Sequence, residues 1–181
     1  MSSEIKRCSW VNLNNPKYIL YHDNEWSKFR VDDKYLFEML ILESFQAGLS
    51  WECVLNKRDN FREAYDDFDI DKIMNYDEKK QEELYNNKGI VRNRLKIKAS
   101  IKNSIIFNDI VLEYGSFYNY LKTFCGDKII YENDKTTSDI SDRLSKDLYK
   151  RGMRFVGSVI IYSYLQAVGI INSHDDCCVF K

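Results

Sequence analysis

The near absence of turn-forming residues constrains the fold of this chain more than any other feature of its sequence. Its 181 residues include one Pro and seven Gly. The many tight turns of an all-β protein need both residue types, whereas the interior of a helix disfavours them. We therefore expect an all-α fold, an orthogonal helical bundle. No repeat, low-complexity tract or Pro/Gly/Ser-rich linker divides residues 1–181, so we expect a single domain.

The spacing of apolar residues predicts where the helices lie. Over residues 33–48 these residues recur with helical period, with Asp32 or Asp33 as a candidate N-cap. A second helix is expected to begin at Ser50, and Ser141 is expected to cap a later one. The remaining helices are expected over residues 70–75, 77–87, 92–107, 111–124, 141–150 and 157–168. No helical pattern covers residues 8–26, 127–138 or 172–181, which are expected to be irregular or extended.

Charge and hydropathy limit the compartment and the partners of the protein. The net charge is −1 and the sequence pI is about 6.2, so a nucleic acid would have to meet a local basic patch. The N-terminus has no signal-peptide apolar core, and no stretch of 18 apolar residues could span a membrane. We expect a cytoplasmic protein without a membrane partner. In that compartment the five Cys are expected to bind metal or to be buried thiols.

Glu43 stands out because it interrupts an apolar helix face. Leu36, Leu40, Glu43 and Ala47 fall at relative positions 0, 4, 7 and 11, which form one stripe of a helix. Burying a carboxylate among core residues is costly unless the charge is paired or meets a ligand. One interpretation places Glu43 at the edge of the stripe or beside a buried Arg. The other places it beside aromatic side chains, facing a flat cationic ligand.

A basic turn joins two of the expected helices. Between residues 88 and 104 there are six Lys or Arg and no Asp or Glu, with Gly89 in the turn itself. A turn that leads into a helix N-terminus offers backbone N–H groups to a phosphate, and nearby cations add attraction. This arrangement is typical of a helix-hairpin-helix, which grips the DNA backbone without reading its sequence. The same pattern also fits an ordinary solvated surface turn.

The two ends of the chain carry residue types that bind zinc. Cys8 and His22 lie near the N-terminus, and His174 lies near the C-terminus with Cys177 and Cys178. The chain has no other His. Two Cys and two His make a tetrahedral zinc site of the structural type, which would join both irregular termini. The alternative is that the Cys are buried thiols, because the separation between the two halves matches no zinc finger.

Several segments, read together, resemble the 3-methyladenine DNA glycosylase I family over nearly the full chain. They are CSW at 8–10, YILYHDNEW at 18–26, LFEML at 36–40, LESFQAGLSW at 42–51, GIVR at 89–92, LSKDL at 144–148, KRGMRFVG at 150–157 and QAVGIINSH at 166–174. The resemblance implies an all-α fold of the helix-hairpin-helix DNA glycosylase type. It also implies one structural zinc ion per chain, on Cys8, His22, His174 and Cys178.

The activity that the resemblance implies is base-excision repair. Such an enzyme hydrolyses the N-glycosidic bond of 3-methyladenine in alkylated double-stranded DNA, after the nucleotide flips into an aromatic pocket, and has no lyase step. Glu43 would be the catalytic carboxylate that contacts the damaged base, and Trp51 would stack on that base. The other aromatic residues implied to bind the substrate are Tyr21, Trp10, Tyr18 and Trp26.

The resemblance also implies which residues bind the DNA itself. Gly48 and Leu49 would fill the gap that the flipped nucleotide leaves. The hairpin residues that would hold the DNA backbone are Gly89, Ile90, Arg92 and Lys96. No obligate protein partner is expected.

Two features of the chain bear on how far the resemblance reaches. The family lacks the catalytic Asp of most helix-hairpin-helix glycosylases, which suits a base that is already a cation and needs no protonation to leave. Ser27 replaces the Gly usual at its position, and the loop over residues 28–30 is unusual for the family.

A non-catalytic, zinc-stapled helical DNA-binding module is the principal alternative to the glycosylase function. A thiol redox protein is less favoured, because the adjacent Cys177 and Cys178 would form a strained disulfide.

Overall fold

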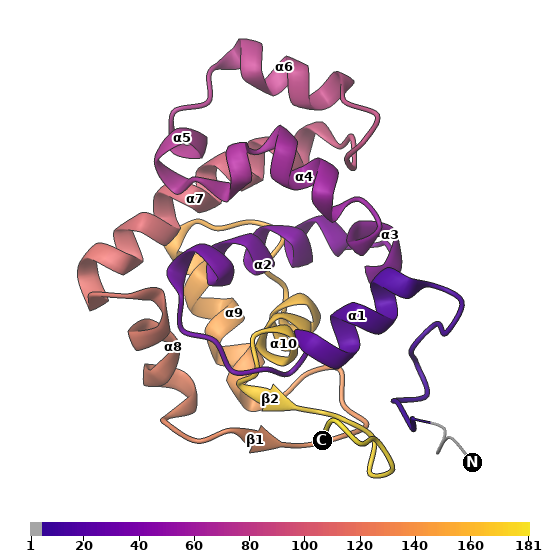
Figure 1. Ribbon diagram of the computed structural model, residues 1–181. Helices are drawn as coiled ribbons and strands as arrows, with labels where there is room; N and C mark the ends of the chain where they lie inside the picture. The colour runs from indigo at the N-terminus through magenta and orange to yellow at the C-terminus, as the bar shows by residue number, and fades with distance from the viewer. Residues whose placement is uncertain (1–4) are drawn as a thin grey trace.

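The computed structural model describes residues 5–181, most of which are helical (Figure 1). The helices are α1 (Pro16–Asn24), α2 (Asp33–Gln46), α3 (Trp51–Leu55), α4 (Arg58–Ala64), α5 (Ile70–Met74), α6 (Glu78–Asn86), α7 (Arg94–Tyr114), α8 (Phe117–Cys125), α9 (Asp139–Arg151) and α10 (Ser158–Ala167), with a 3₁₀ turn η1 (Asp66–Phe68). Two short strands, β1 (Ile130–Tyr131) and β2 (Ile171–Asn172), are also present. Every helix among these residues is too short or too polar to cross a membrane.

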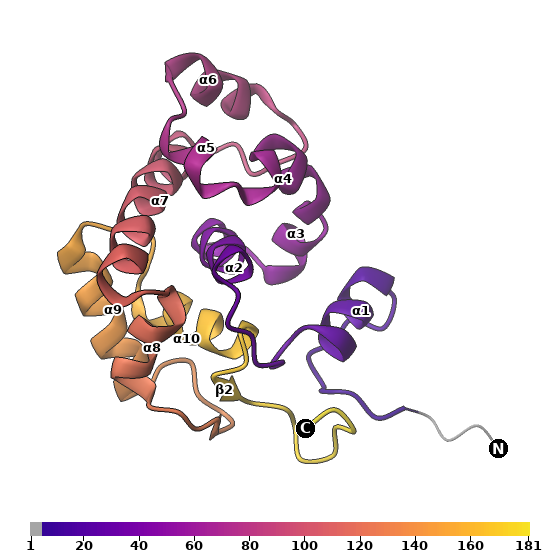
Figure 2. The ribbon, with the colours of Figure 1, turned by 60° about the vertical axis from the view of Figure 1, so that its left-hand side comes forward.

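Helix α2 forms the centre of the molecule. Figures 1 and 2 show it between α4, α5 and α6 on one side and α8, α9 and α10 on the other. The side chain of Asp32 caps its first turn by accepting a hydrogen bond from the amide of Tyr35, at 2.8 Å. Ten consecutive residues, 36–45, are buried, so the helix has no solvent-facing side over most of its length. A buried polar residue on α2 is therefore surrounded by protein rather than by water.

The basic turn lies between α6 and α7, as the sequence predicts. Asn93 caps α7 by accepting hydrogen bonds from the amides of Leu95 and Lys96. Arg94 ties the two helices together, because its guanidinium pairs with Glu82 at 2.9 Å and lies 3.7 Å from the centre of the Tyr85 ring. The side chain of Arg94 thus holds the two helices together across the turn.

Several helix boundaries differ from those predicted. The region 8–26 contains α1, which Asn15 caps through the amides of Lys17 and Tyr18. Helix α7 runs on to Tyr114 and ends at Gly115, whose φ of +81° lies in the left-handed region. Helix α9 begins at Asp139, and Ser138 rather than Ser141 is its N-cap.

The all-α expectation also needs a correction at the lower edge of the molecule in Figure 1. There β1 pairs with β2 in parallel, with Ile130 opposite Ile171 and Tyr131 opposite Asn172. These two short strands fall in the segments that lack a helical pattern. They bring residues 132–134 beside the C-terminal tail, where both segments contribute to one pocket.

Ser27, which replaces the Gly usual for the family, lies in the loop after α1. Ser27 has a φ of +61°, which favours Gly, and its hydroxyl donates a hydrogen bond to the Ile171 carbonyl at 3.0 Å. The next residues lie directly on Gly169, where an added Cβ would come within 2.3 Å of the Phe29 amide nitrogen. The unusual 27–30 loop is thus held against the end of α10.

Candidate active site and metal centre

A cavity of about 360 Å³ opens between α1, α2, α10 and the two terminal segments. All six residues that the sequence analysis assigns to the damaged base line it. Its lining residues are Ser9, Trp10, Tyr18, Tyr21, Trp26, Glu43, Gln46, Trp51, Asn133, Asp134, Ser163, Gln166, Ser173 and Asp175. The structure therefore brings together predicted residues that lie as much as 41 positions apart in the sequence, Trp10 and Trp51.

Glu43 lies on α2 with only 3% of its surface exposed. Its Oε2 atom is buried without a hydrogen-bond partner, and among residues 5–181 no cationic side chain forms a salt bridge with it. Burial raises the pKa of this carboxyl from its ordinary value to about 8. The protein thus holds a carboxyl group at the pocket with its hydrogen-bonding capacity partly unused.

The interpretation of Glu43 as a partner of a buried Arg is wrong. The nearly buried Arg58 instead donates hydrogen bonds to Glu38 and Glu25, each at 2.7 Å. Arg62 also pairs with Glu38, at 2.8 Å. In this separate ion-pair network the arginines pair with Glu38, five positions before Glu43. Glu43 itself lines the pocket instead.

Aromatic rings surround the cavity in two groups. Tyr21 and Trp51 lie with their ring centres 5.2 Å apart and their planes tilted by 46°. Trp10 contacts Trp26 at 4.7 Å and Tyr18 at 5.4 Å between ring centres. The pocket thus combines flat aromatic faces with the carboxyl group of Glu43. This combination suits a planar cation, because stacking and charge attraction act together.

Sequence reasoning missed the polar part of the lining. Gln46 lies three residues after Glu43 on α2, and helical spacing could have identified it. Its Oε1 atom and the Trp51 Nε1 atom are both buried without a hydrogen-bond partner. Asn133 and Asp134 reach the pocket from the loop after β1, for which no local pattern gave a signal. The pocket therefore presents both stacking surfaces and free hydrogen-bonding atoms.

The turn between α2 and α3 is shaped to present Leu49. Gly48 has a φ of +78°, and a Cβ at that position would meet no atom within 4 Å, so its conformation rather than crowding favours Gly. Leu49 follows with 42% of its surface exposed, although it is a large apolar residue. This exposed side chain projects beside the helix that carries Glu43.

Lys96 has a different place from the one expected. It is buried, and its ammonium group donates hydrogen bonds to the carbonyl oxygens of Phe45 at 2.8 Å and Ala47 at 2.6 Å. These carbonyls belong to the end of α2. The ammonium therefore binds the end of α2 rather than a DNA phosphate, because an amine held by two carbonyls inside the protein is not free at the surface.

Part of the turn between α6 and α7, the hairpin, is occupied by contacts within the protein. The Gly89 amide donates to the Asn87 side chain at 2.8 Å, and the Ile90 side chain is buried. Arg92 is exposed. Of the expected DNA-binding residues in the hairpin, Arg92 is thus the one whose charged side chain faces solvent.

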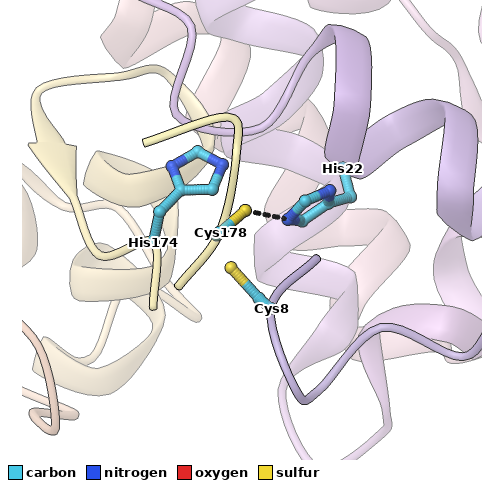
Figure 3. Close-up of side chains that lie close together, drawn as sticks. All are labelled: Cys8, His22, His174 and Cys178. Atoms are coloured by element: carbon cyan, nitrogen blue, oxygen red, sulfur yellow. Dashed lines mark hydrogen bonds between the residues drawn. The ribbon is translucent and has the colours of Figure 1, made fainter. Parts of the chain in front are cut away.

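Cys8, His22, His174 and Cys178 form a buried cluster that could hold a metal ion. Figure 3 shows the four side chains pointing toward one another. One ligand atom from each residue lies within 4.8 Å of those of the other three. The sulfur of Cys178 is 3.6 Å from Nε2 of His22. Cys177 is exposed, so the structure decides between the two adjacent Cys in favour of Cys178.

The surroundings of the two imidazoles fit a metal site. Nδ1 of His22 lies 2.8 Å from Asp23, and Nδ1 of His174 lies 2.9 Å from Asn172. These partners leave each Nε2 facing the cluster, and Nε2 of His174 is buried without a hydrogen-bond partner. Burial raises the pKa of the Cys8 thiol to about 12 and lowers the pKa of His174 to about 4. A bound cation would offset the cost of forming the thiolate.

Comparisons with known proteins show which family this chain is similar to. A family model described as methyladenine glycosylase matches residues 10–181. DNA-3-methyladenine glycosylase 1 of Escherichia coli (strain K12) is 41% identical over 183 residues, with 97% of each chain covered. A crystal structure of 3-methyladenine DNA glycosylase I has a TM-score of 0.92 at 40% identity, covering 96% of this chain and 98% of that one. Another, of a variant in complex with 3-methyladenine, has a TM-score of 0.92 at 31% identity, covering 97% of each chain.

Proposed function

Because this chain belongs to the methyladenine glycosylase family, we propose that it excises 3-methyladenine from alkylated double-stranded DNA by hydrolysing the N-glycosidic bond. The observation that carries this function is the buried, unpaired carboxyl of Glu43 in a pocket walled by aromatic rings. A 3-methylated adenine in DNA carries a positive charge. It supplies the partner that Glu43 lacks, and its flat faces match the rings of Tyr21 and Trp51.

The reaction needs little acid catalysis from the protein. As the bond between the sugar and the base breaks, its electron pair moves to the base, which leaves without added protonation because it was already a cation. Water adds to the sugar carbon and releases a proton, leaving an abasic site. Ionised Glu43 stabilises the positive charge as it spreads over base and sugar. No lyase step follows.

The surface beside the pocket fits the flipping of a nucleotide out of the duplex. Leu49 would enter the base stack in place of the flipped base, while Arg92 would contact the DNA backbone. Flipping costs a few kcal/mol of lost stacking and pairing, and an inserted apolar side chain offsets part of that cost. The buried Lys96 supports the Leu49 turn from inside.

We propose that the Cys8, His22, His174 and Cys178 cluster binds one structural zinc ion. Two thiolates and two imidazoles match the donor set of closed tetrahedral sites. The orphaned Nε2 of His174 and the Nδ1 partners of both imidazoles support this proposal. Bound zinc would hold the two terminal segments together. Because Trp10 and Asp175 lie next to these ligands and line the pocket, the metal would also position part of the pocket wall.

A base-release assay tests the proposed activity. The purified protein is incubated with duplex DNA alkylated by a methylating agent, and the released bases are separated and identified. We expect enzyme-dependent release of 3-methyladenine, leaving alkali-labile abasic sites and no strand cleavage by the protein itself. Binding to the duplex with no base released would favour the non-catalytic DNA-binding module instead.

A further inference from the structure

The pocket carries a carboxylate that the proposed function does not use. Three acidic residues line the cavity, Glu43, Asp134 and Asp175, and its lining includes no Lys or Arg. Glu43 is buried and faces the base in the function proposed above. Asp175 is occupied by the chain itself, because it accepts a hydrogen bond from the Ser9 amide at 2.7 Å. Asp134 is the remaining acidic side chain of the lining.

The carboxylate of Asp134 is exposed and has no partner within residues 5–181. It forms no salt bridge there, although a lysine follows it directly in the chain. That residue, Lys135, pairs instead with Glu132, at 2.6 Å. The oxygen atoms of Asp134 are therefore available to a group that enters the pocket.

The backbone holds Asp134 in an uncommon conformation. Its φ of +59° lies in the left-handed region, which Asp and Asn adopt more readily than most residues other than Gly. The chain just before it is fixed to the C-terminal segment, because the Glu132 amide donates to the Asn172 carbonyl at 3.2 Å and β1 pairs with β2. Residues that their surroundings hold in sparsely populated conformations cluster at functional sites.

Two buried polar atoms on the same wall of the pocket could hold a water molecule. Oδ1 of Asn133 and Oγ of Ser173 are each buried without a hydrogen-bond partner, and both residues line the cavity. The strand register places them near each other, because Tyr131 lies opposite Asn172. An unpaired buried polar group is costly, and a bound water removes that cost where the site is polar. This wall therefore suits a water molecule next to Asp134.

The depths of Glu43 and Asp134 match the two ends of the bond that breaks. Glu43 is 3% exposed and lies deep in the cavity, whereas Asp134 is exposed and lies at its mouth. A flipped base enters the pocket first, while its sugar remains attached to the DNA backbone outside. The sugar carbon that receives the water is therefore closer to the mouth than the base is, on the side of Asp134.

We propose that Asp134 accepts the proton of the attacking water, and that Asn133 and Ser173 hold this water beside the sugar carbon. The bond between that carbon and the base breaks, and its electron pair moves to the base. The water oxygen forms the new bond to the carbon, while one of its protons passes to the Asp134 carboxylate and from there to solvent. This inference rests on the proposed function, because it names the acceptor for a proton that the hydrolysis releases.

Single-turnover excision by Asp134→Asn tests this role. Asn keeps the size of the side chain and tolerates a positive φ, so the loop keeps its conformation. We expect release of 3-methyladenine from alkylated duplex to slow by roughly 100-fold, within the range for general acid–base catalysis. Affinity for free 3-methyladenine should stay at the wild-type value, because Glu43 and the aromatic rings are unchanged. The matched control is Asp109→Asn, which removes the same charge from an exposed position on α7 and should excise at the wild-type rate.

A second variant separates a chemical role from a structural one. Asp134→Gly suits the backbone conformation and leaves space for a small carboxylate, so added formate should restore part of its lost excision rate and should not accelerate the wild type. Asn133→Ala should slow excision several-fold with unchanged affinity for free 3-methyladenine.

Three results would overturn the role of Asp134: a wild-type rate in Asp134→Asn, a loss of rate matched by an equal loss of affinity for the free base, or no effect of formate on Asp134→Gly. Release of 3-methyladenine by the wild-type protein would still establish the proposed function in each of these cases. Absence of release by the wild-type protein would instead contradict the proposed function itself.

Discussion

Burial holds the pKa of Glu43 near 8, so the charge that this residue offers to a substrate depends on pH in the physiological range. The carboxyl is protonated in most molecules below that pH, when the pocket contains no cation. A cationic base entering the pocket favours the ionised form, because the two charges then compensate each other in a region that water reaches poorly. The residue is thus set to ionise when its ligand arrives.

This state of Glu43 predicts a pH profile for catalysis. The kcat/KM for release of 3-methyladenine should rise with pH and level off above an apparent pKa of about 8, because that ratio reports the free enzyme. Glu43→Gln should abolish the rise and lose about 1.5–3 kcal/mol of transition-state stabilisation, the range of a hydrogen bond to a charged group. Identical pH profiles for the two proteins would mean that the charge of Glu43 does not act in the reaction.

The same residue predicts an opposite effect on stability. Because the folded-state pKa of Glu43 is raised, its contribution to the free energy of unfolding is fully present below its ordinary pKa and is lost as pH rises through about 8. We therefore expect Glu43→Gln to gain stability over the wild type as the pH is raised from about 6 to about 9. Denaturant titrations at the two pH values measure this difference. A variant that unfolds more easily than the wild type at both pH values, yet excises normally per folded molecule, would identify Glu43 as a structural residue.

At the scale of elements, α7 supports the end of α2 through one side chain. Lys96 donates to two carbonyls that close α2 directly before the Gly48–Leu49 turn. Cations near a helix C-terminus are favourable, since the last carbonyls have no partner within the helix. The end of α2, directly before the Leu49 turn, is therefore held by a direct contact from α7.

Replacing Lys96 should accordingly disturb base flipping more than DNA attraction. We expect Lys96→Met to lower the single-turnover excision rate and to reduce stability by about 1–3 kcal/mol, because the carbonyls lose charged donors. The salt slope of duplex binding should stay near the wild-type value. Arg92→Ala, which removes an exposed cation from the hairpin, is the matched comparison and should lower the slope by about one unit. A lowered salt slope in Lys96→Met would mean that Lys96 contacts a DNA phosphate after all.

At the scale of the whole molecule, the two ends of the chain close on each other. Figure 2 shows the tail after β2 approaching the segment before α1. The Val179 amide donates to the Lys6 carbonyl at 3.0 Å, and the Ser9 amide donates to Asp175 at 2.7 Å. The four buried metal-ligand candidates lie in the same two segments and in α1.

The proposed zinc site predicts a metal content of about one zinc per chain. Cys8→Ser or Cys178→Ser should remove the metal and lower Tm by about 10 °C or more, because structural zinc contributes several kcal/mol and each kcal/mol is worth about 2–4 °C in a chain of this size. Cys177→Ser is the matched control, since its exposed thiol lies one residue from the site. Elemental analysis and thermal unfolding provide the measurements. Equal metal content and Tm in Cys8→Ser and Cys177→Ser would exclude the site.

The sequence alone determined features that depend on neighbours along one helix. The spacing of Leu36, Leu40, Glu43 and Ala47 predicted that Glu43 is buried, because residues three and four apart share a helix face whatever the rest of the chain does. The same reasoning predicted the positions of α2, α6 and α10 to within a few residues. The set of aromatic residues at the pocket came from the resemblance of whole segments, which local periodicity does not supply.

Only the tertiary structure decided features that depend on contacts between distant residues. Lys96 binds carbonyls about fifty positions earlier in the chain, so its local pattern of exposed basic neighbours predicted a surface contact and was misleading. The arrival of Asn133 at the pocket through the pairing of β1 with β2 has the same origin. The chemical type of a residue sets what its side chain can bind, but the packing of elements remote in the sequence decides which partner lies within reach.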